Sequence, residues 1–256
     1  MMLTSQVFTI MSNTATKEQV KEIISSSDTY LYDPCIGGYK LNTNFKELKT
    51  DLGRMFGFAY GQKENGAVFS HMAVMYANAL YQRGFVKEGY KVIDTLYRHC
   101  SNFEKSRIYP GIPEYIGENG RGLYHYLTGA ASWLLLTVLT EMYGVKGYYG
   151  NLKLSPKLTL EQFDEYQQAY VKLVFADRKL LVLYHNPLKK EYGDYHVKSI
   201  TINDKLYNNY SNSDNCSNSD NSINLSNSSS SKRNGTILRN DIEALDTSIE
   251  HKIIVE

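Results

Sequence analysis

The chain has 256 residues, a length that predicts one large domain or two unequal ones, and 42% of them are hydrophobic, which is enough for a core. Its 28 Lys and Arg nearly balance its 27 Asp and Glu, and the formal net charge of +1 argues against a protein held on nucleic acid by charge. No apolar run reaches the ~18–20 residues of a membrane span, and the first residues lack the basic and apolar regions of a secretory signal. These features predict a cytoplasmic protein that binds neither nucleic acid nor membrane.

The cysteines and tyrosines carry little specific information. Cys35, Cys100 and Cys216 are odd in number and widely spaced, which fits neither a disulfide framework nor a metal-binding pair, so free thiols in a reducing compartment are expected. The 22 tyrosines offer flat apolar faces with a hydroxyl, which suit a sugar or peptide surface. Ordinary half-buried packing explains the same composition, and the sequence leaves both interpretations open.

The first part of the chain carries helical patterns. Residues 17–27 form an amphipathic stretch with Thr16 as its expected N-cap. Apolar residues at helical spacing predict two further helices, the first with Val68, Met72, Met75 and Ala79 and the second with Val86, Tyr90, Ile93 and Tyr97.

A third helix is expected over residues 128–143, where Gly144 stops it. It is apolar nearly all round and should therefore be buried on most sides. The loops around these helices, 30–44, 52–66 and 101–126, are long and rich in Gly and Pro. Loops of that length in a compact helical domain are usually functional.

After residue 150 the apolar period changes to two. Residues 170–175 and 179–184 predict a hairpin, and further strands are expected at 196–202, 236–238 and 251–255. Between them, residues 208–231 include 20 Ser, Asn or Asp in 24 positions, which predicts a disordered insertion. The expected organisation is a mainly α domain over 1–150, followed by a small β-domain over 151–256.

Two junctions between a loop and a helix could bind a ligand. At the first, Lys63, Glu64, Asn65 and Gly66 precede the helix that holds His71, and they offer paired donors and acceptors to a polyhydroxylated molecule. A solvated loop and an internally satisfied histidine explain these residues equally well.

At the second junction, Thr128 and Gly129 open the apolar third helix. Free N–H groups at a helix N-terminus, together with a glycine that permits close approach, suit an anion. An ordinary threonine cap with a glycine used for packing is the alternative. The sequence contains no GxxxxGK[ST], HExxH or GxSxG motif.

Taken together, these segments resemble the C-terminal part of glycoside hydrolase family 94, the cellobiose phosphorylase family. The similarity lies in residues 63–71 (KENGAVFSH) and 126–133 (YLTGAASW), with GVKG at 144–147 and LSPKL at 154–158. Residues 54–61 (RMFGFAYG) and 108–115 (IYPGIPEY) resemble most the subgroup that acts on 1,2-β-oligoglucans. The match covers most of residues 1–207 and resumes at 236–256.

The resemblance implies part of an (α/α)6 barrel followed by a small β-sandwich. It also implies phosphorolysis of a β-glucosidic bond in a gluco-oligosaccharide, with inversion, to give α-glucose 1-phosphate. Inorganic phosphate is then a co-substrate, and no cofactor is expected. Inversion requires an acid on the leaving oxygen and a nucleophile on the opposite face of the sugar.

Carried over by position, His71, Thr128 and Gly129 would hold the phosphate, and Lys63 and Glu64 would lie near the sugar subsites. The aspartate that serves this family as general acid stands well upstream of the segment at Lys63, as does an arginine that clamps phosphate.

The available carboxylates, Asp28, Asp33 and Asp51, stand in no matching motif. The chain is therefore expected to be a C-terminal fragment that is inactive alone, and its full-length relatives are expected to be homodimers. A non-catalytic remnant that only binds carbohydrate or phosphate is the alternative. An unrelated helical interaction protein would require all the matched motifs to be coincidental.

Overall fold

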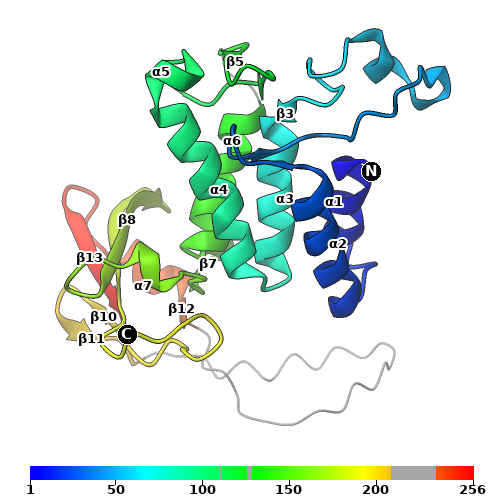
Figure 1. The fold of residues 1–256 in the computed structure, drawn as a ribbon. Coiled ribbons are helices and arrows are strands. Elements are labelled where there is room, and N and C mark those ends of the chain that lie inside the picture. The colour runs from blue at the N-terminus through cyan, green and yellow to red at the C-terminus, as the bar shows by residue number, and fades with distance from the viewer. Residues whose placement is uncertain (110, 126–128, 209–234) are drawn as a thin grey trace. The chain divides into compact units, whose positions relative to one another are not determined.

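The computed structural model describes residues 1–109, 111–125, 129–208 and 235–256 (Figure 1). They divide into two compact units, Met1–Glu141 and Met142–Glu256, which we call unit 1 and unit 2. The Ser/Asn-rich insertion expected at 208–231 lies, apart from Asn208, outside the described residues. Within the described ranges, no helix has both the length and the apolar character needed to cross a membrane.

Unit 1 is built on helices, and α3 lies at their centre in contact with α1, α4 and α6 (Figure 1). Ten of the 13 residues of α3 are buried, and Tyr76, Leu80 and Tyr81 are its largest fully buried side chains. The helices of this unit are α1 (Leu3–Met11), α2 (Lys17–Tyr30), α3 (Ser70–Gln82), α4 (Val86–Ser101), α5 (Phe103–Ser106) and α6 (Gly129–Leu136), with short 3-10 turns η1 (Thr50–Leu52) and η2 (Arg54–Gly57).

The N-cap predicted for α2 is confirmed. The Thr16 hydroxyl accepts from Gln19 N at 3.2 Å, and the Gln19 side chain accepts from Thr16 N at 2.8 Å, which completes a capping box. The two side chains thus accept hydrogen bonds from backbone N–H groups at the helix start that have no partner within the helix.

Two details of the predicted helices are wrong. Val68 lies in a short strand ahead of α3, because its backbone pairs with another strand. Tyr97 is 61% exposed, since the buried stripe of α4 runs instead through Val92, Ile93 and Leu96. The third predicted helix is confirmed over its described residues: it begins as α6 and continues as a π-helical stretch, η3 (Thr137–Met142), which ends before Gly144.

The apolar surface of α6 is covered on one side only, against the expectation of burial on most sides. Ala130 is fully buried, and Trp133 packs against the core cluster around Val74 and Leu96. Leu135 and Leu136 are 62% and 46% exposed. A helix covered by neighbours on one face leaves its other residues in solvent, whatever their hydrophobicity.

The long loops of unit 1 contain two small antiparallel sheets. One pairs β1 (Tyr32–Asp33) with β2 (Gly38–Tyr39). The other has the order β3-β4-β5, from β3 (Val68–Phe69), β4 (Tyr115–Ile116) and β5 (Gly122–Leu123). The second sheet therefore ties the loop before α3 to the loop before α6.

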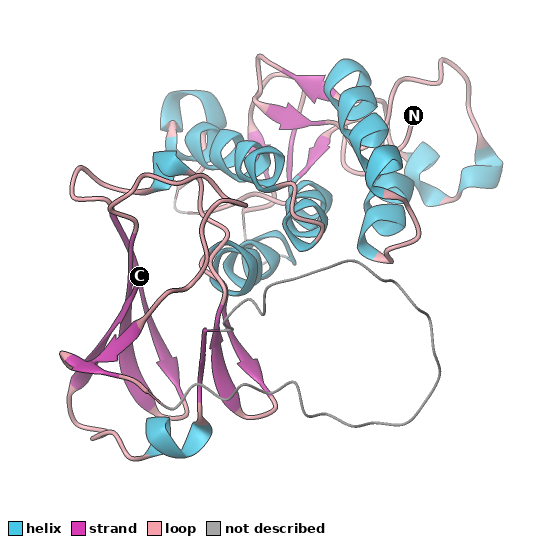
Figure 2. Cartoon of the chain, turned by 90° about the horizontal axis from the view of Figure 1, so that it is seen from below, coloured by secondary structure: helices cyan, strands magenta, loops and turns pink. Residues whose placement is uncertain are grey.

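Unit 2 contains two sheets, drawn in magenta with the other strands in Figure 2. The larger has the order β11-β10-β13-β9-β8, and the smaller β12-β7-β6. The strands are β6 (Val145–Tyr148), β7 (Asn151–Leu154), β8 (Gln168–Phe175), β9 (Arg178–His185), β10 (Ile200–Ile202), β11 (Lys205–Leu206), β12 (Gly235–Ile237) and β13 (Glu250–Val255), together with the short helices η4 (Leu160–Gln162) and α7 (Arg239–Glu243).

The predicted hairpin is confirmed as β8 and β9, joined through Ala176 and Asp177. Both residues have positive φ, 47° and 60°, as the tight turns that match strand twist require. β13 pairs with β9 in parallel, and the other pairings of both sheets are antiparallel. The fold thus combines helices and strands, and the partial (α/α)6 barrel and the small β-sandwich stay predictions.

Candidate functional site

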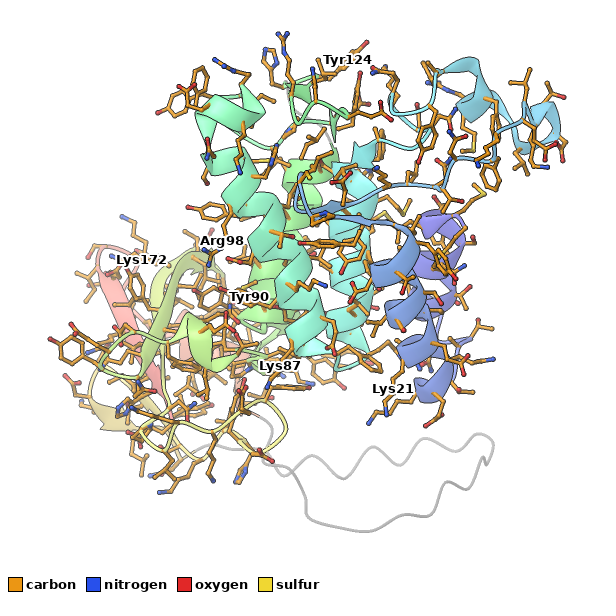
Figure 3. All side chains as sticks on the ribbon, viewed as in Figure 1. Lys21, Lys87, Tyr90, Arg98, Tyr124 and Lys172 are labelled. Atoms are coloured by element: carbon orange, nitrogen blue, oxygen red, sulfur yellow. The ribbon has the colours of Figure 1, made fainter. Side chains whose placement is uncertain are left out.

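The sheet β3-β4-β5 gathers three segments of unit 1 at the start of α3. Ser70 N donates to the carbonyl of Glu114 at 2.9 Å, and Glu114 N donates to the carbonyl of Tyr124 at the same distance. Tyr124 lies at the opposite end of unit 1 from Lys21 (Figure 3). The backbone of these residues is fixed by strand pairing, so their side chains are held next to the loop at Lys63.

The loop over residues 62–66 is shaped by internal hydrogen bonds. Asn65 Nδ2 donates to Phe58 O at 2.8 Å, and Asn65 Oδ1 accepts from Asn42 Nδ2 at 3.1 Å. Gly66 has φ +79°, and a Cβ there would lie 2.2 Å from the Tyr60 ring. Asn65, expected from the sequence as a ligand group, therefore holds the loop in place, and Gly66 permits its close packing.

Lys63 presents its ammonium group to an aromatic ring. Its Nζ lies 4.0 Å from the centroid of Tyr124 and 5.6 Å from that of Phe58. Burial works to lower the pKa of Lys63, but the contact with Tyr124 and the charges of Glu114 and Glu64 outweigh it and raise that pKa. Lys63 therefore stays a cation in the neutral range.

Two carboxylates flank this ammonium group. Glu64 Oε1 accepts from Arg54 Nη2 at 3.3 Å, and Glu64 Oε2 and Glu114 Oε2 are both buried. Neither Oε2 atom has a hydrogen-bond partner among the residues that the structure describes. Buried acceptors left in this state cost free energy, which a ligand with hydroxyl groups would recover. Sequence reasoning missed Glu114 and Tyr124 as site residues, although both lie in a loop marked as functional by its length.

His71 and Gly129 are brought together, 58 positions apart in the chain. A Cβ on Gly129 would lie 2.6 Å from His71 Cε1 and 2.7 Å from Nδ1, so the glycine leaves the space that the imidazole occupies. Trp133, one turn further along α6, places its ring centroid 6.0 Å from that of His71. Thr128, the third residue expected to hold phosphate, lies outside the described residues.

The imidazole of His71 is held neutral by its surroundings. Burial lowers its pKa below the usual value of 6.5. Its Nε2 is buried and has no hydrogen-bond partner in the described part of the chain, and the same is true of Ser70 Oγ next to it. The His71 ring thus lies against the first residue of α6 with a buried nitrogen that has no partner in the described chain, and the prediction that an anion binds there stays a prediction.

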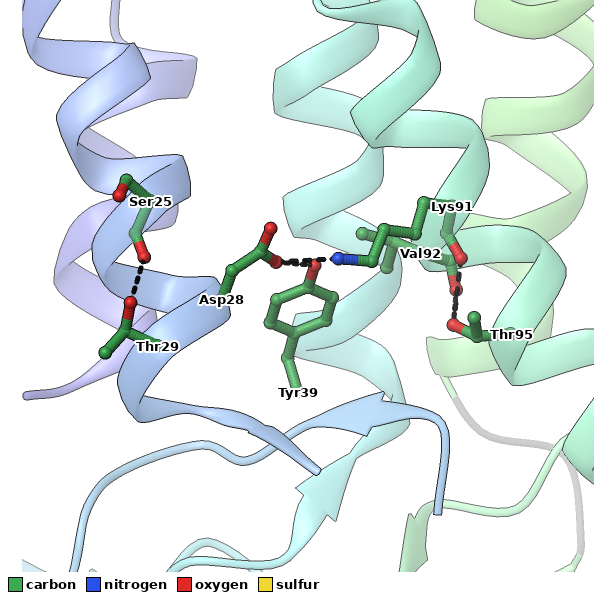
Figure 4. Close-up of polar contacts among 7 residues, drawn as sticks. All are labelled: Ser25, Asp28, Thr29, Tyr39, Lys91, Val92 and Thr95. Carbon is green, nitrogen blue, oxygen red and sulfur yellow. Dashed lines mark hydrogen bonds and ion pairs between the residues drawn. The ribbon is translucent and has the colours of Figure 1, made fainter. Parts of the chain in front are cut away.

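Two of the three aspartates considered as acids are engaged elsewhere. Asp28 Oδ1 accepts from Lys91 Nζ at 2.9 Å and from the hydroxyl of buried Tyr39 (Figure 4). Asp33 pairs with Lys40 at 2.9 Å; although its partial burial works to raise the pKa, Lys40 and the backbone N–H groups of Ile36 and Cys35 lower it. Asp51 is exposed in η1.

Metal binding finds no support in the described ranges, where no cluster of three or more His, Cys, Asp or Glu side chains could hold an ion. The groups gathered at the start of α3 are instead an ammonium, two carboxylates, an imidazole and aromatic rings. Such a set can bind hydroxyl groups and an oxyanion side by side.

The chain is similar in sequence to a known family and to several named phosphorylases. Residues 1–144 match the family model described as Glycosyl hydrolase 94 superfamily, catalytic domain. The chain is 24% identical over 171 residues to a cellobionic acid phosphorylase of Neurospora crassa. The aligned region covers 61% of this chain and 21% of the relative. It is 23% identical over 211 residues to a solabiose phosphorylase of Paenibacillus borealis, covering 79% of this chain and 26% of the relative.

A third relative is the N,N'-diacetylchitobiose phosphorylase of Vibrio proteolyticus, 27% identical over 163 residues, with 60% of this chain and 20% of the relative covered. The chain thus spans about a fifth to a quarter of the length of the curated relatives it matches. The family model covers more than half of the chain, including both predicted junctions. The chain therefore belongs to the glycosyl hydrolase 94 superfamily, and residues 1–144 are part of its catalytic domain.

Proposed function

We propose that unit 1 supplies the phosphate- and sugar-binding part of an inverting glycoside phosphorylase. Its substrates would be inorganic phosphate and a β-linked gluco-oligosaccharide, and its product α-glucose 1-phosphate. The observation that carries the proposal is the packing of the His71 ring on Gly129, with Nε2 buried and without a partner in the described chain. The relatives, all named phosphorylases, support the reaction class.

In this proposal phosphate lies between His71 and the N-terminus of α6. Nε2 of His71 would donate a hydrogen bond to one phosphate oxygen, and the backbone N–H groups of α6, beginning at Gly129, would face another. Phosphate is already an anion at neutral pH, so it needs positioning for its attack on the anomeric carbon more than it needs a base.

The sugar would lie toward Lys63 and the two carboxylates. Glu64 Oε2 and Glu114 Oε2 would accept hydrogen bonds from sugar hydroxyl groups, and the Lys63 ammonium would donate one. The exposed faces of Tyr124 and its neighbours would border the apolar side of the ring. Two acceptors and one donor, fixed by the sheet and the loop, would set the orientation of a pyranose.

Phosphorolysis also requires an acid that protonates the leaving glycosidic oxygen. The ion pairs of Asp28 and Asp33 argue against both for that role. From the family resemblance, we assign the acid to an aspartate on a segment that would precede this one in a complete catalytic domain. The chain alone would then bind its substrates without turning them over.

The test is a titration of the 256-residue chain with inorganic phosphate and with β-linked glucose disaccharides, followed by calorimetry and by a coupled assay for glucose 1-phosphate. Binding of both without release supports the proposal. Absence of any binding would overturn it. Release at enzyme-like rates would place the acid in this chain, and Asp28, Asp33 and Asp51 would be the first residues to mutate.

The second candidate is a protein that binds sugar or phosphate without catalysis. It is favoured because Asp28 and Asp33 form ion pairs and are therefore poorly suited to act as the acid. The two candidates separate when the upstream part of a family 94 catalytic domain is supplied as a second polypeptide. Restored release of glucose 1-phosphate supports the enzyme, and continued binding without release supports the binding-only protein.

A further inference from the structure

Unit 2 has a pocket at one edge of its larger sheet, separate from the groups described above. β9 and β13 run parallel, so their C-terminal ends lie at the same edge, and the segment before antiparallel β10 meets them there. The pocket has a volume of about 180 Å³. It is lined by residues of the segments 185–190 and 195–198 and by the end of β13.

The wall of this pocket is apolar. Its carbon surface comes from the side chains of Pro156, Phe163, Tyr184, Leu188, Tyr195 and Val197. The two tyrosine hydroxyls are already used: that of Tyr184 donates to Tyr143 O at 2.5 Å, and that of Tyr195 donates to Leu158 O at 2.9 Å. The interior therefore presents ring faces and aliphatic carbon to an occupant.

The size of the pocket matches a single ring. An apolar cavity of roughly 150 Å³ in a protein stays dry and accepts benzene. Leu188, 73% exposed, stands at the mouth, so a ring could enter from solvent. The loop that carries Leu188 is held by Asn186, whose Nδ2 donates to Lys190 O at 2.9 Å and whose Oδ1 accepts from Lys190 N at 3.1 Å. The mouth is therefore a built feature of the fold.

The rim carries both signs of charge, with two lysines and Glu256. Lys190 and Lys198 line the opening and are exposed. The oxygens of Glu256 at the rim are hydrogen-bonded within the protein: Oε1 lies 3.4 Å from Nδ1 of His185, which also lines the pocket, and Oε2 accepts from Ser199 Oγ at 3.3 Å. Its main-chain oxygen accepts from Ser199 N at 3.1 Å and from Lys198 N. Because protein donors already engage the Glu256 oxygens, the two lysine ammonium groups are the charges at the rim that an anionic group could pair with, while its apolar part filled the pocket.

We propose that this pocket binds a small aromatic carboxylate, with the ring inside and the carboxylate between Lys190 and Lys198. A sugar fits poorly here, because its hydroxyl groups would be buried against carbon without partners. The inference is independent of the proposed phosphorylase function, since every residue that carries it lies in unit 2.

The test uses the full chain and fluorine-19 NMR with 4-fluorophenylacetate, compared with 4-fluorophenylacetamide, which has the same ring and no charge. We expect the carboxylate to bind more tightly than the amide. Exposed charge pairs contribute about 0.2–1 kcal/mol each, so Lys190→Gln with Lys198→Gln should weaken the carboxylate about two- to thirtyfold and leave the amide unchanged.

Lys205→Gln is the matched control, because it removes the same charge from edge strand β11 outside the pocket lining. Leu188→Ala, at the exposed mouth, should weaken both ligands. Equal affinity for acid and amide, or equal loss in the control, would overturn the proposal. Tighter binding of a phenylalanine-containing peptide than of the free acid would also overturn it, by marking a protein-docking site.

Discussion

The His71 imidazole occupies the space in which a side chain at residue 129 would stand, with Cε1 only 2.6 Å from the position of a Cβ on Gly129. A histidine at the start of α3 is thereby held against the N-terminus of α6. Its pKa is lowered by the same burial that removes water from Nε2. The contact joins the two junctions that sequence patterns identified separately.

Gly129→Ala should therefore weaken phosphate binding. The methyl group would displace the imidazole, and loss of one hydrogen bond to a charged group should reduce the binding free energy by about 1.5–3 kcal/mol. Titration calorimetry with inorganic phosphate measures this. Gly57→Ala is the control, since a Cβ there meets nothing within 4 Å. Unchanged phosphate affinity in Gly129→Ala would remove Gly129 from the site.

Anion binding should strengthen as the pH falls, because His71 is neutral without ligand and a bound anion favours its protonated form. Sulfate is the suitable probe, as it does not titrate between pH 7.5 and 5.5. We expect its affinity to rise across this interval and to stay constant in His71→Gln. A pH-independent affinity in the unmodified chain would show that His71 is not the titrating contact.

The lowered pKa of His71 also fixes the sign of a stability effect. The unfolded chain takes up a proton near the usual value of 6.5, whereas the folded chain does so only at a lower pH. The contribution of His71 to the free energy of unfolding is thus present above about pH 6.5 and is lost as the pH falls through the lowered pKa. Sulfate should reduce that loss, which urea unfolding at several pH values would detect.

Glu64→Gln and Glu114→Gln should each weaken binding of a β-linked glucose disaccharide while leaving phosphate affinity unchanged. Each substitution keeps the shape of the side chain but replaces one charged acceptor by an amide, and hydrogen bonds to charged groups contribute about 1.5–3 kcal/mol. Glu104→Gln, at an exposed position in α5, is the control. An effect of Glu114→Gln equal to that of Glu104→Gln would confine the sugar site to the loop at Lys63.

Asp28→Asn should lower stability and leave ligand binding intact. Tyr39 is buried, and burial together with the Asp28 carboxylate raises the pKa of its hydroxyl, which keeps it a donor to Asp28. Loss of the charged acceptor should cost about 1–2 kcal/mol of unfolding free energy, as the partly exposed Lys91 pair adds little. Urea unfolding, with exposed Asp51→Asn as control, measures the difference.

Ala176→Asn should stabilise unit 2. Ala176 has φ +47° in the turn between β8 and β9, a conformation that costs alanine roughly 1 kcal/mol and asparagine less. Asp177→Ala, at φ +60° in the same turn, should destabilise for the same reason. Thermal unfolding of the full chain gives both shifts, and equal melting temperatures would show that the turn is not strained.

Features that depend on local interactions could be predicted from the amino-acid sequence. The cap of α2 follows from Thr16 and Gln19, and the hairpin at 176–177 follows from two alternating runs separated by a short turn. The resemblance to the family also rests on local motifs, because the segments KENG (63–66) and LTG (127–129) can be recognised without knowing what they contact. None of these conclusions requires knowledge of distant residues.

Which of those groups face one another depends on how distant parts of the chain pack together. The pairing of β3, β4 and β5 places Glu114 and Tyr124 beside Lys63, although about 50–60 positions separate them in the chain. The folded chain also uses the Asn65 side chain to hold its own loop, where the sequence suggested a ligand-binding group. It leaves Leu135 exposed on α6, where the apolar pattern predicted burial. A side chain's role depends on the neighbours that packing supplies, and long-range packing leaves no periodic mark on the sequence.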